Sequence, residues 1–476
     1  MKIILMTIKY AACLLLALAV LVLLSIPLSI GEFPDDLATV DNSRPLLLDQ
    51  VNIVDVKTGL VLENRQIRIA GGVIESIQAA GSSSGAEYEW IDLKGAWVVP
   101  GLFDMHVHIH DRKYLALNLA YGVTSVRNMR GLPMHLRWKA ELNDGRWLGS
   151  NLYTSSPVLD GEKYAHALQQ VVTSPAEARR LVTKYQAAGY DLIKAYGYLD
   201  KAVFEAIVDE ASRLGMPVGK HGPNPVAGAT LASNRGLQSL EHVEDIFQGP
   251  LNYEYDRDVL LKWIEELKTI EPAVTPTLAT FHHLTRLSEG KDAFVETLPL
   301  DTLNPLYKVI NREFAVTRWL AASEAQIEWN KAEELHLLEI TRELDAHDIR
   351  LLVGSDAGTM YMPAGSSTHL EMALMQQAGL SPGTVLQAAT INAAEALAID
   401  AHYGSVEVGK IADLVVVAEN PLIDLPALAQ PTAVIKAGQW LSAEDLAALR
   451  ASAEHPSNLY MSLGRLLEDL LSRALS

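Results

Sequence analysis

Strand-like and helix-like segments alternate along the middle of the chain, and this alternation constrains the fold more than any other feature. Short β-branched runs at 123–127 and 191–196 alternate with segments of helical spacing at 176–188 and 201–214, and glycines end both helical segments. Such an alternation indicates βα units and a parallel sheet. Roughly eight units over about 300 residues predict an α/β protein with a (β/α)8 TIM barrel at 101–403.

The two flanks of this central region are rich in short β-branched runs separated by Gly and Thr-Gly turns. Because these runs enclose everything else, we expect residues 46–100 and 404–445 to pair into one small composite β-sandwich domain. Residues 285–346 are helical and rich in Trp, Glu and Leu, which predicts a helical insertion or lid over the mouth of the barrel. Residues 446–476 predict a C-terminal helical tail.

The N-terminal segment is a separate matter. Lys2 and Lys9 precede an uncharged run at 10–30, which is long enough to cross the ~30 Å hydrocarbon layer as a helix. Basic residues before the run and acidic residues after it place the body of the chain outside the cytoplasm. Small residues at 29–31, just after the helix-breaking Pro27, favour the alternative of a cleaved secretory signal. Residues 1–30 therefore predict an inner-membrane anchor with an extracytoplasmic body or, if they are cleaved, a secreted or periplasmic protein.

Charge and cysteine content exclude several kinds of partner and chemistry. The chain has 39 Lys and Arg against 58 Asp and Glu, and this balance of −19 argues against nucleic acid as a partner. The single cysteine, Cys13, lies in the N-terminal apolar run, so the body can hold neither a disulfide nor a thiolate nucleophile. The sequence leaves the oligomeric state open, a homo-oligomer included.

One motif carries two metal-ligand side chains at strand spacing. Residues 98–108 read Val-Val-Pro-Gly-Leu-Phe-Asp-Met-His-Val-His, so His106 and His108 would leave the same face of a strand. Neutral imidazole is the commonest protein ligand for zinc. A strand that merely happens to carry two histidines is the plain alternative. The choice depends on whether other segments supply the missing ligands.

Further ligand-type residues end four other predicted strands, namely Lys194, His221, His242 and Asp356. Each alone has a simpler explanation: a surface lysine, two structural histidines, and a turn or helix-capping aspartate. Chemistry in a barrel lies where strands end and loops begin. Six such residues in chain order therefore predict one shared metal site.

These motifs together resemble a known family. The order Pro-Gly-Leu-Phe-Asp-Met-His-Val-His, Asp-Leu-Ile-Lys, Gly-Lys-His-Gly, Leu-Glu-His and Gly-Ser-Asp-Ala-Gly resembles the metal-dependent amidohydrolase superfamily. Its prolidase-like and imidazolonepropionase-like branch is the most similar. The likeness extends to 369–371, 388–394 and 409–414, and it covers about residues 46–440. Two residues depart from the pattern: Asn128, where the branch often has aspartate, and Lys220, where a small residue is commoner.

The resemblance implies a binuclear site with two divalent metal ions, most often Zn²⁺. His106, His108 and Asp356 would hold one ion, and His221 and His242 the other, with Lys194 bridging them as N6-carboxylysine. The ions would lower the pKa of a shared water to about 7, and Asp356 would act as general base and then general acid. The implied reaction is hydrolysis of an amide-type C–N bond in a small molecule.

The substrate is left open between a dipeptide, an N-acyl amino acid and a cyclic amide. Candidate substrate contacts are Tyr196, His283 and His369, and ordinary packing is the alternative for each. A different class of function is a non-catalytic amidohydrolase-like binding or scaffold protein tethered to the membrane. Such a protein should have lost some of the six metal ligands. Measurement of bound metal separates this hypothesis from that of a hydrolase.

Overall fold

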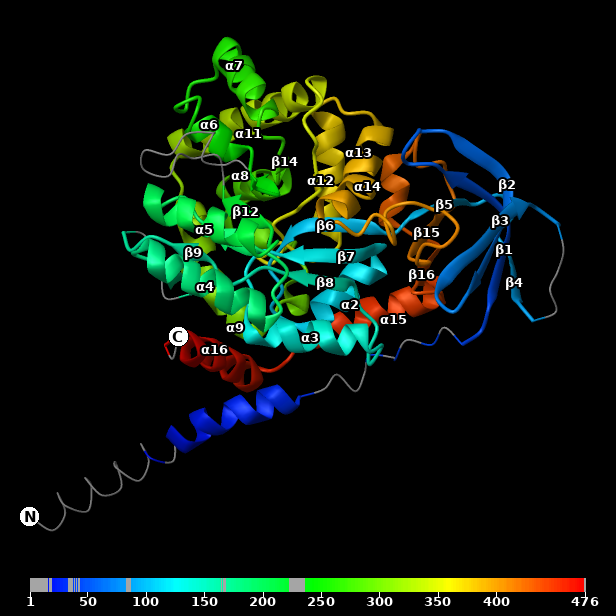
Figure 1. The fold of residues 1–476 in the computed structure, drawn as a ribbon, viewed down its shortest axis with the longest axis horizontal. Coiled ribbons are helices and arrows are strands. Elements are labelled where there is room, and N and C mark those ends of the chain that lie inside the picture. Colours follow the sequence, from blue (N-terminus) through cyan, green and yellow to red (C-terminus); the bar gives the residue numbers. More distant parts are fainter. Residues whose placement is uncertain are drawn as a thin grey trace, which may run out of the picture.

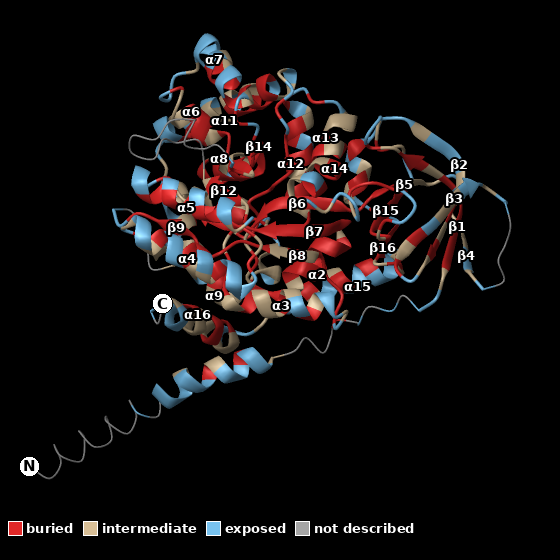
Figure 2. Cartoon of the chain, in the orientation of Figure 1, coloured by how far each residue is buried: buried red, intermediate tan, exposed pale blue. Residues whose placement is uncertain are grey.

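The computed structural model of the 476-residue chain describes residues 43–82, 87–163, 168–221 and 236–474, together with residues 16, 19–32, 37, 39, 41 and 165. The fold is α/β, with buried strands at the centre and helices outside them (Figures 1 and 2). The N- and C-terminal β segments lie together at one end of the molecule (Figure 1).

The largest sheet joins the two ends of the chain. Its strand order is β17-β16-β15-β5-β1-β2-β3, and β4 pairs with β1. The junction is the antiparallel pair of β15 and β5, in which Val415 lies opposite Val99. The predicted pairing of the two flanks in one sheet is thus observed, while their division into a separate sandwich domain stays a prediction. The strands are β1 Leu46–Val54, β2 Val61–Ala70, β3 Val73–Ala79, β4 Glu89–Asp92, β5 Trp97–Pro100, β15 Leu414–Val417, β16 Ala433–Lys436 and β17 Gln439–Ser442.

The central strands form two mainly parallel sheets, of order β6-β7-β8 and β10-β9-β11-β12-β13-β14. Isolated parallel bridges extend the pairing: Ser155 pairs with Leu192, Val274 with Leu351, and Ala357 with Val107. Hydrogen bonding therefore continues from one sheet to the other and back to β6. The strands are β6 Leu102–Val107, β7 Val123–Asn128, β8 Asn151–Thr154, β9 Leu159–Asp160, β10 Gln170–Val171, β11 Ile193–Ala195, β12 Val218–His221, β13 Ser239–Glu241 and β14 Ala273–Thr275.

Helices follow most of the central strands, and the predicted helices at 176–188 and 201–214 are confirmed to within a residue or two. The first of them, α4, begins where the Ser174 side chain caps the Glu177 N–H and ends at Gly189, whose φ of 93° suits a left-handed cap. The helices of this region are α2 Arg112–Ala120, α3 Pro133–Asn143, α4 Pro175–Ala188, α5 Lys201–Arg213, α6 Glu244–Gln248, α7 Arg257–Lys268, α12 Ser366–Gln377, α13 Pro382–Ala388, α14 Ile391–Ala396 and α15 Ala443–Ala453.

The segment predicted as a helical insertion is helical. It contains α8 Leu278–Val295, α9 Pro305–Asn311, α10 Thr317–Leu320 and α11 Glu324–Ala346, with short turns at η2 Leu300–Thr302 and η3 Arg312–Val316. A further short turn, η4 Leu425–Ala429, precedes β16, and the C-terminal tail forms α16 Leu459–Ala474. The strand predicted to end at Asp356 is not a regular strand: Leu351 before it and Ala357 directly after it form isolated bridges.

The chain enters the central strands through a tight turn at Gly101, between β5 and β6. A β-carbon at this position would lie 2.1 Å from the Thr124 hydroxyl oxygen, so only glycine fits. The Gly101 N–H donates to the Asp413 carbonyl at 2.8 Å, which ties the turn to β15. All six residues of β6 are buried, and this strand carries the first candidate ligand into the interior.

The predicted membrane anchor requires correction. Within the described part of the chain, no helix combines the length and apolar composition needed to cross a membrane. The described N-terminal helical stretch comprises residues 19–31. The predicted inner-membrane anchor is therefore wrong. Residues 1–15, 17 and 18, on which part of the prediction falls, lie outside the described residues.

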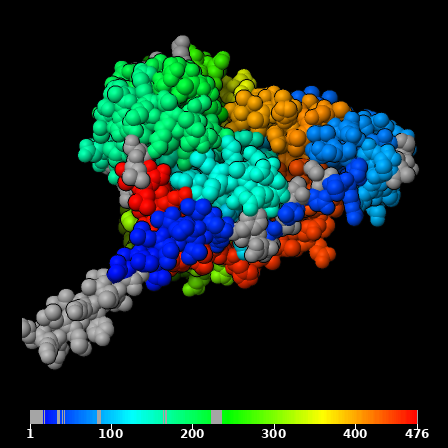
Figure 3. Space-filling view, turned by 60° about the horizontal axis from the view of Figure 1, so that its bottom comes forward, coloured from blue at the N-terminus to red at the C-terminus, as the bar shows by residue number. Residues whose placement is uncertain are grey.

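This N-terminal helical stretch packs against α16 instead (Figure 3). A β-carbon on Gly464 would lie 2.1 Å from the Ser25 carbonyl, so the two helices approach closely at this glycine. The Tyr460 hydroxyl donates to the Leu21 carbonyl at 2.6 Å, and Arg465 forms an ion pair with Glu32. The two termini of the described chain are thus held together.

Candidate metal centre

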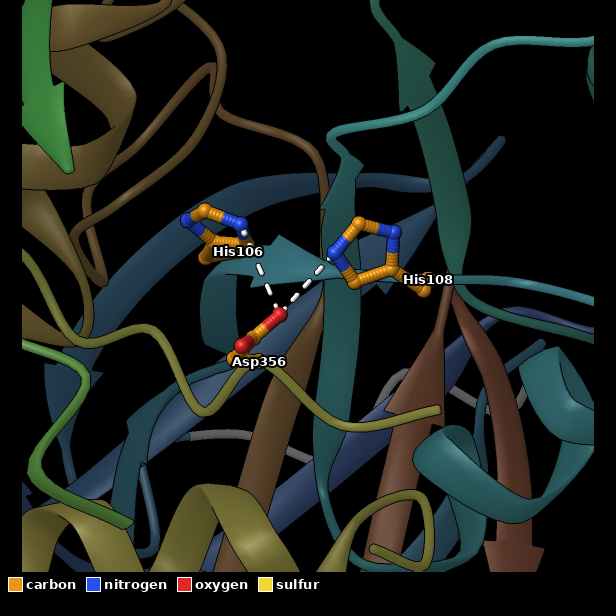
Figure 4. A group of neighbouring side chains, drawn as sticks. All are labelled: His106, His108 and Asp356. Carbon is orange, nitrogen blue, oxygen red and sulfur yellow. Dashed lines mark ion pairs between the residues drawn. The ribbon is translucent and has the colours of Figure 1, made fainter. Parts of the chain in front are cut away.

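Three predicted ligands from distant parts of the sequence meet at one point. His106 lies in β6, His108 directly follows that strand, and Asp356 lies beside the bridge between Ala357 and Val107. One ligand atom from each of the three lies within 4.8 Å of the others (Figure 4). The imidazoles share a face of the strand, as their spacing predicted.

The geometry of these three side chains is that of a ligand set. The Asp356 Oδ1 atom lies 2.9 Å from His108 Nε2 and 3.6 Å from His106 Nε2. Both Nε2 atoms therefore face the same carboxylate oxygen. Two imidazole nitrogens and a carboxylate oxygen are the donor types that zinc and similar divalent ions accept.

The orientation of His106 is fixed from behind by Glu241. His106 Nδ1 lies 2.8 Å from Glu241 Oε2, so the Nδ1 proton is held there and the Nε2 lone pair faces Asp356. Glu241 in turn accepts from Arg127 at 2.7 Å, and neither of these side chains is exposed. Burial alone would raise the pKa of Glu241, but Arg127 and Lys194 outweigh it and hold the pKa below its ordinary value. Glu241 is therefore an anion.

The other three predicted ligands lie beside this group. The His242 ring centroid is 4.7 Å from that of His106 and 4.6 Å from that of His221. Lys194 is buried in β11, and its charge affects the pKa of His106 and of the other two imidazoles. All six residues predicted as ligands thus lie close together.

Some polar atoms of this cluster lack hydrogen-bond partners in the described part of the chain and are of the types that bind cations. Lys194 Nζ and His221 Nδ1 are buried and have no hydrogen-bond partner among the described residues, and Asp356 Oδ1 faces the Nε2 atoms of His106 and His108. Such unsatisfied buried atoms are rare in folded proteins and call for a ligand, ion or reaction to explain them. The donor set is one that divalent cations take, so the residues present fit the implied metal centre.

Burial sets the protonation of these ligands. It lowers the pKa of His106, His221 and His242 well below the ordinary value, with the Lys194 charge acting in the same direction. Burial also lowers the pKa of Lys194, to about 8. The three imidazoles are therefore neutral near pH 7, which is the form that binds metal ions.

Two of the candidate ligands have left-handed backbone. His242 has φ 69° and Asp356 has φ 59°, and neither is a glycine. Left-handed conformations cost free energy for such residues and recur at functional sites. Gly358 has φ 97°, and a β-carbon there would lie 2.0 Å from the His108 carbonyl oxygen, so this turn can approach the ligands only without a side chain.

A cavity of about 1000 Å³ opens over this group. Five of the six predicted ligands line it, the exception being the deeply buried Lys194. Much of the opposite wall comes from the predicted helical insertion, including Leu284, Phe314, Trp319 and Trp329. The insertion therefore shapes the space over the cluster.

The three predicted substrate contacts differ in their placement. Tyr196 lines the cavity, and its ring stacks on His221 with centroids 4.3 Å apart. His283 Nε2 lies 2.8 Å from the Met360 carbonyl oxygen, and His369 Nε2 lies 2.8 Å from that of Tyr121. Neither of these two histidines lines the cavity. Their role as substrate contacts stays a prediction to which this geometry adds no support.

Several residues of the site escaped the sequence reasoning. Glu241 orients His106. It lies in β13 directly before His242, and the sequence reasoning chose only the histidine of this pair. Arg130 and His110 also line the cavity; the two-residue spacing of His106 and His108 extends to His110, whereas no spacing rule singles out Arg130. Asn128, noted as a departure, accepts the Ile109 N–H at 3.0 Å and donates to the Arg130 carbonyl at 2.9 Å, so it joins the loops after two strands.

Comparison with known proteins places the chain in a family. Residues 97–441 match the profile of the Amidohydrolase family. The imidazolonepropionase of Symbiobacterium thermophilum is 42% identical over 64 residues, which cover 13% of this chain and 15% of that protein. Matches to adenine deaminases of Rhizobium and Serratia cover 15–18% of their length, so the chain aligns with a small part of each curated relative.

Solved structures align over far more of the chain. A putative prolidase from Bifidobacterium longum is 26% identical, with a TM-score of 0.65, over 87% of this chain and 100% of that chain. A bottromycin amidohydrolase is also 26% identical, with a TM-score of 0.70, over 90% of this chain and 93% of that one. These similarities confirm the resemblance, including the prolidase-like branch, that the sequence motifs indicated.

Proposed function

The chain belongs to the amidohydrolase family, and we propose that it is a metal-dependent hydrolase of an amide-type C–N bond in a small molecule. The observation that carries the proposal is the meeting of His106, His108 and Asp356 under a large cavity. The prolidase and imidazolonepropionase names of similar proteins point to the same bond type. A non-catalytic relative would have no reason to keep unsatisfied ligand atoms buried at the floor of an open cavity.

We propose that the central strands close into a (β/α)8 barrel with the metal centre at one mouth. The support is the chain of pairings that runs through β6, β7 and β8 to β11–β14 and returns to β6 through Leu351 and Ala357. In this arrangement Asp356 lies beside the isolated bridge of Ala357, and the other five of the six ligands come from strands or from residues directly after strands. That is where barrel enzymes hold their chemistry.

We propose two divalent ions, zinc being the expected one, held by the ligand sets that the resemblance implied. When bound, such ions lower the pKa of a water toward 7 and polarise a carbonyl. Lys194 would bridge them after its amine attacks carbon dioxide, forming an N–C bond to give a carbamate and releasing one proton. The buried, unpartnered Lys194 amine, whose pKa lies at about 8, supports this because a substantial neutral fraction exists near pH 7–8.

The chain's own residues supply orientation and proton transfer. Glu241 holds His106 in the tautomer that leaves Nε2 free, and Thr277 Oγ1, 2.7 Å from His242 Nδ1, does the same for His242. Asp356 would take a proton from the attacking water and deliver it to the departing nitrogen. Thr280 Oγ1, 3.3 Å from Asp356 Oδ2, would hold that carboxylate in place. The aromatic side chains of the cavity would exclude bulk water from the reacting carbonyl.

Metal analysis combined with a substrate panel tests the proposal. Protein grown with added zinc should carry up to two ions per chain, and His106→Asn should lower this content. His347→Asn changes the histidine that directly follows α11 and lies outside the cavity, so it should not affect metal content. The panel comprises dipeptides, N-acyl amino acids, lactams, cyclic imides and adenine.

Asp356→Asn should lower kcat on any substrate found by about 10²–10⁴-fold. ¹³C-bicarbonate should give a carbamate signal that Lys194→Met lacks. Absence of bound metal in the wild type, together with activity that Asp356→Asn leaves intact, would refute the proposal.

A further inference from the structure

Arg130 presents an unsatisfied cation to the cavity that holds the metal centre. It follows β7 by two residues, and its side chain lines the cavity. Its Nε and Nη2 atoms are buried and have no hydrogen-bond partner within the described part of the chain. Arginine cannot relieve this by losing its proton. A buried donor left unpaired costs free energy, so the arrangement calls for an acceptor beyond the described residues, and a ligand in the cavity can supply one.

The acidic groups nearest along the fold are occupied elsewhere. Burial raises the pKa of Asp469 in α16 and the Arg130 charge lowers it, so the two charges interact. No hydrogen bond joins them among the described residues, and Asp469 forms its ion pair with Arg473 at 2.8 Å. Asp111 accepts from the Asn304 side chain at 3.1 Å and from the Ser457 N–H at 2.8 Å. Neither carboxylate bonds to Arg130. The guanidinium is therefore available to an anion in the cavity.

The backbone of Arg130 is held rigidly on both sides. Asn128 Nδ2 donates to the Arg130 carbonyl at 2.9 Å, and the Gly131 N–H donates to the Ser156 carbonyl at 3.1 Å. A β-carbon on Gly131 would lie 1.6 Å from the Ser155 carbonyl oxygen, so the loop packs as closely as a backbone can. An aspartate at 128 could not donate this hydrogen bond. Asn128, which stands where the family branch often has aspartate, thus helps to fix the position of Arg130.

Apolar and aromatic side chains line part of the cavity, beside charged ones such as Arg318 and Glu333. The apolar and aromatic ones belong to α8, α10 and α11 and include Phe281, Leu284, Trp319 and Trp329. The volume of about 1000 Å³ lies at the upper end of the range of ligand cavities, and it exceeds what a dipeptide fills. Arg130 therefore suits an anion, and the aromatic side chains suit a large apolar group.

We propose that Arg130 binds the carboxylate of the substrate, and that the substrate is an amino acid acylated on nitrogen by a large apolar acyl group. This inference rests on the proposed amide hydrolysis and narrows its substrate class. Water would add across the C–N bond, so the acyl carbon gains the oxygen and the amino acid leaves with the nitrogen and a proton. A neutral lactam would leave Arg130 unpaired, and a short dipeptide would leave the aromatic side chains uncovered.

Matched substrates test the carboxylate contact. N-decanoyl-L-leucine and N-decanoyl-L-leucinol carry the same amide, and only the first has a carboxylate. For the zinc-loaded wild type, kcat/KM should favour the acid by about 10–100-fold, as expected for a hydrogen bond to a charged group. Arg130→Met should lose about that factor on the acid and less than about threefold on the alcohol. Arg130→Lys should regain part of it, because the charge remains but the planar fork does not.

Arg318→Met is the matched control, because Arg318 lines the same cavity and lies over the Trp319 ring at 4.4 Å. It should change both substrates by the same factor. Equal losses of acid and alcohol activity in Arg130→Met, with a lower urea midpoint, would mean that Arg130 serves only the fold and would overturn the inference. Wild-type protein that does not distinguish acid from alcohol would overturn it as well.

Binding to metal-free protein separates this inference from the proposed function. Calorimetry with N-decanoyl-L-leucine should show binding that Arg130→Met weakens about 10–100-fold and that the leucinol analogue lacks. If the wild type hydrolyses no amide but shows this pattern, the proposed function fails and the anion site stands. If it hydrolyses amides but Arg130→Met binds acid and alcohol as the wild type does, the anion site fails and the proposed function stands.

Discussion

Removal of the Glu241 carboxylate is the most informative perturbation of the supports behind the metal centre. Glu241 accepts from Arg127 at 2.7 Å, and its other oxygen lies 2.8 Å from His106 Nδ1. Glu241→Gln keeps the shape of the side chain and removes its charge. The substitution thereby alters an ion pair that supports the fold and a hydrogen bond that orients a ligand.

The expected magnitudes follow from the burial of this pair, in which both side chains are 0% exposed. Loss of one partner leaves the Arg127 charge uncompensated in the interior, which should lower the free energy of unfolding by about 3–5 kcal/mol. Arg127→Met should be similarly costly, and the double variant should recover part of the loss, with a coupling energy of about 2–3 kcal/mol. Zinc affinity should fall about 10–100-fold in Glu241→Gln and in the double variant, because in both of them His106 loses the carboxylate that orients it.

Urea unfolding of the metal-free proteins, followed by tryptophan fluorescence, measures the first effect. Zinc titration against a competing chelator measures the second. Lys268→Met, which removes an exposed ion pair with Glu265, is the control and should leave the urea midpoint unchanged. Additive single-variant losses with no coupling would refute the account of the ion pair. Unchanged zinc affinity in Glu241→Gln would refute the account of His106.

Three further changes test other parts of the fold. Burial raises the pKa of Glu371 to about 8, above the ordinary 4.5, so its stabilising contribution is complete below about pH 4.5, declines as the pH rises and is lost above about pH 8. Glu371→Gln should therefore raise the urea midpoint at pH 8.5 and leave it unchanged at pH 4.5. Gly358→Ala should weaken zinc binding at least about tenfold in a chelator titration, because its β-carbon would clash with the His108 carbonyl. Gly464→Val should displace the helix that carries Ser25, and limited proteolysis should then remove the N-terminal segment faster.

The sequence predicted that the candidate ligands lie close together, because their positions relative to strands are a local property. His106 and His108 were placed on one face by the two-residue period of a strand, and Lys194, His221 and His242 by the ends of β-branched runs. Parallel strands bring such ends together without any knowledge of the intervening loops. The same rule also found Asp356, although the structure gives its segment isolated bridges rather than a regular strand.

Side-chain direction was beyond the sequence, because it depends on partners far away in the chain. His283 and His369 were chosen for their chemistry, and each lies against a backbone carbonyl outside the cavity. Arg130 was passed over, because nothing local shows that a guanidinium will lack a partner. The N-terminal run was judged by hydropathy alone, and its described part packs on α16, more than 400 residues away in sequence.

The distribution of unfavourable features supports a functional reading of the cavity. Left-handed backbone at His242 and Asp356, the unpaired Lys194 amine and the unpaired Arg130 guanidinium all lie around one space, and each is unfavourable in the protein alone. Features of this kind persist only where the surrounding structure is stable enough to hold them. Here the rigid surroundings are the buried strand β6, with the Arg127 and Glu241 pair behind it. Cations at the floor and a carboxylate at Arg130 would satisfy most of these groups at once, so the same ligands that the chemistry needs should also stabilise the fold.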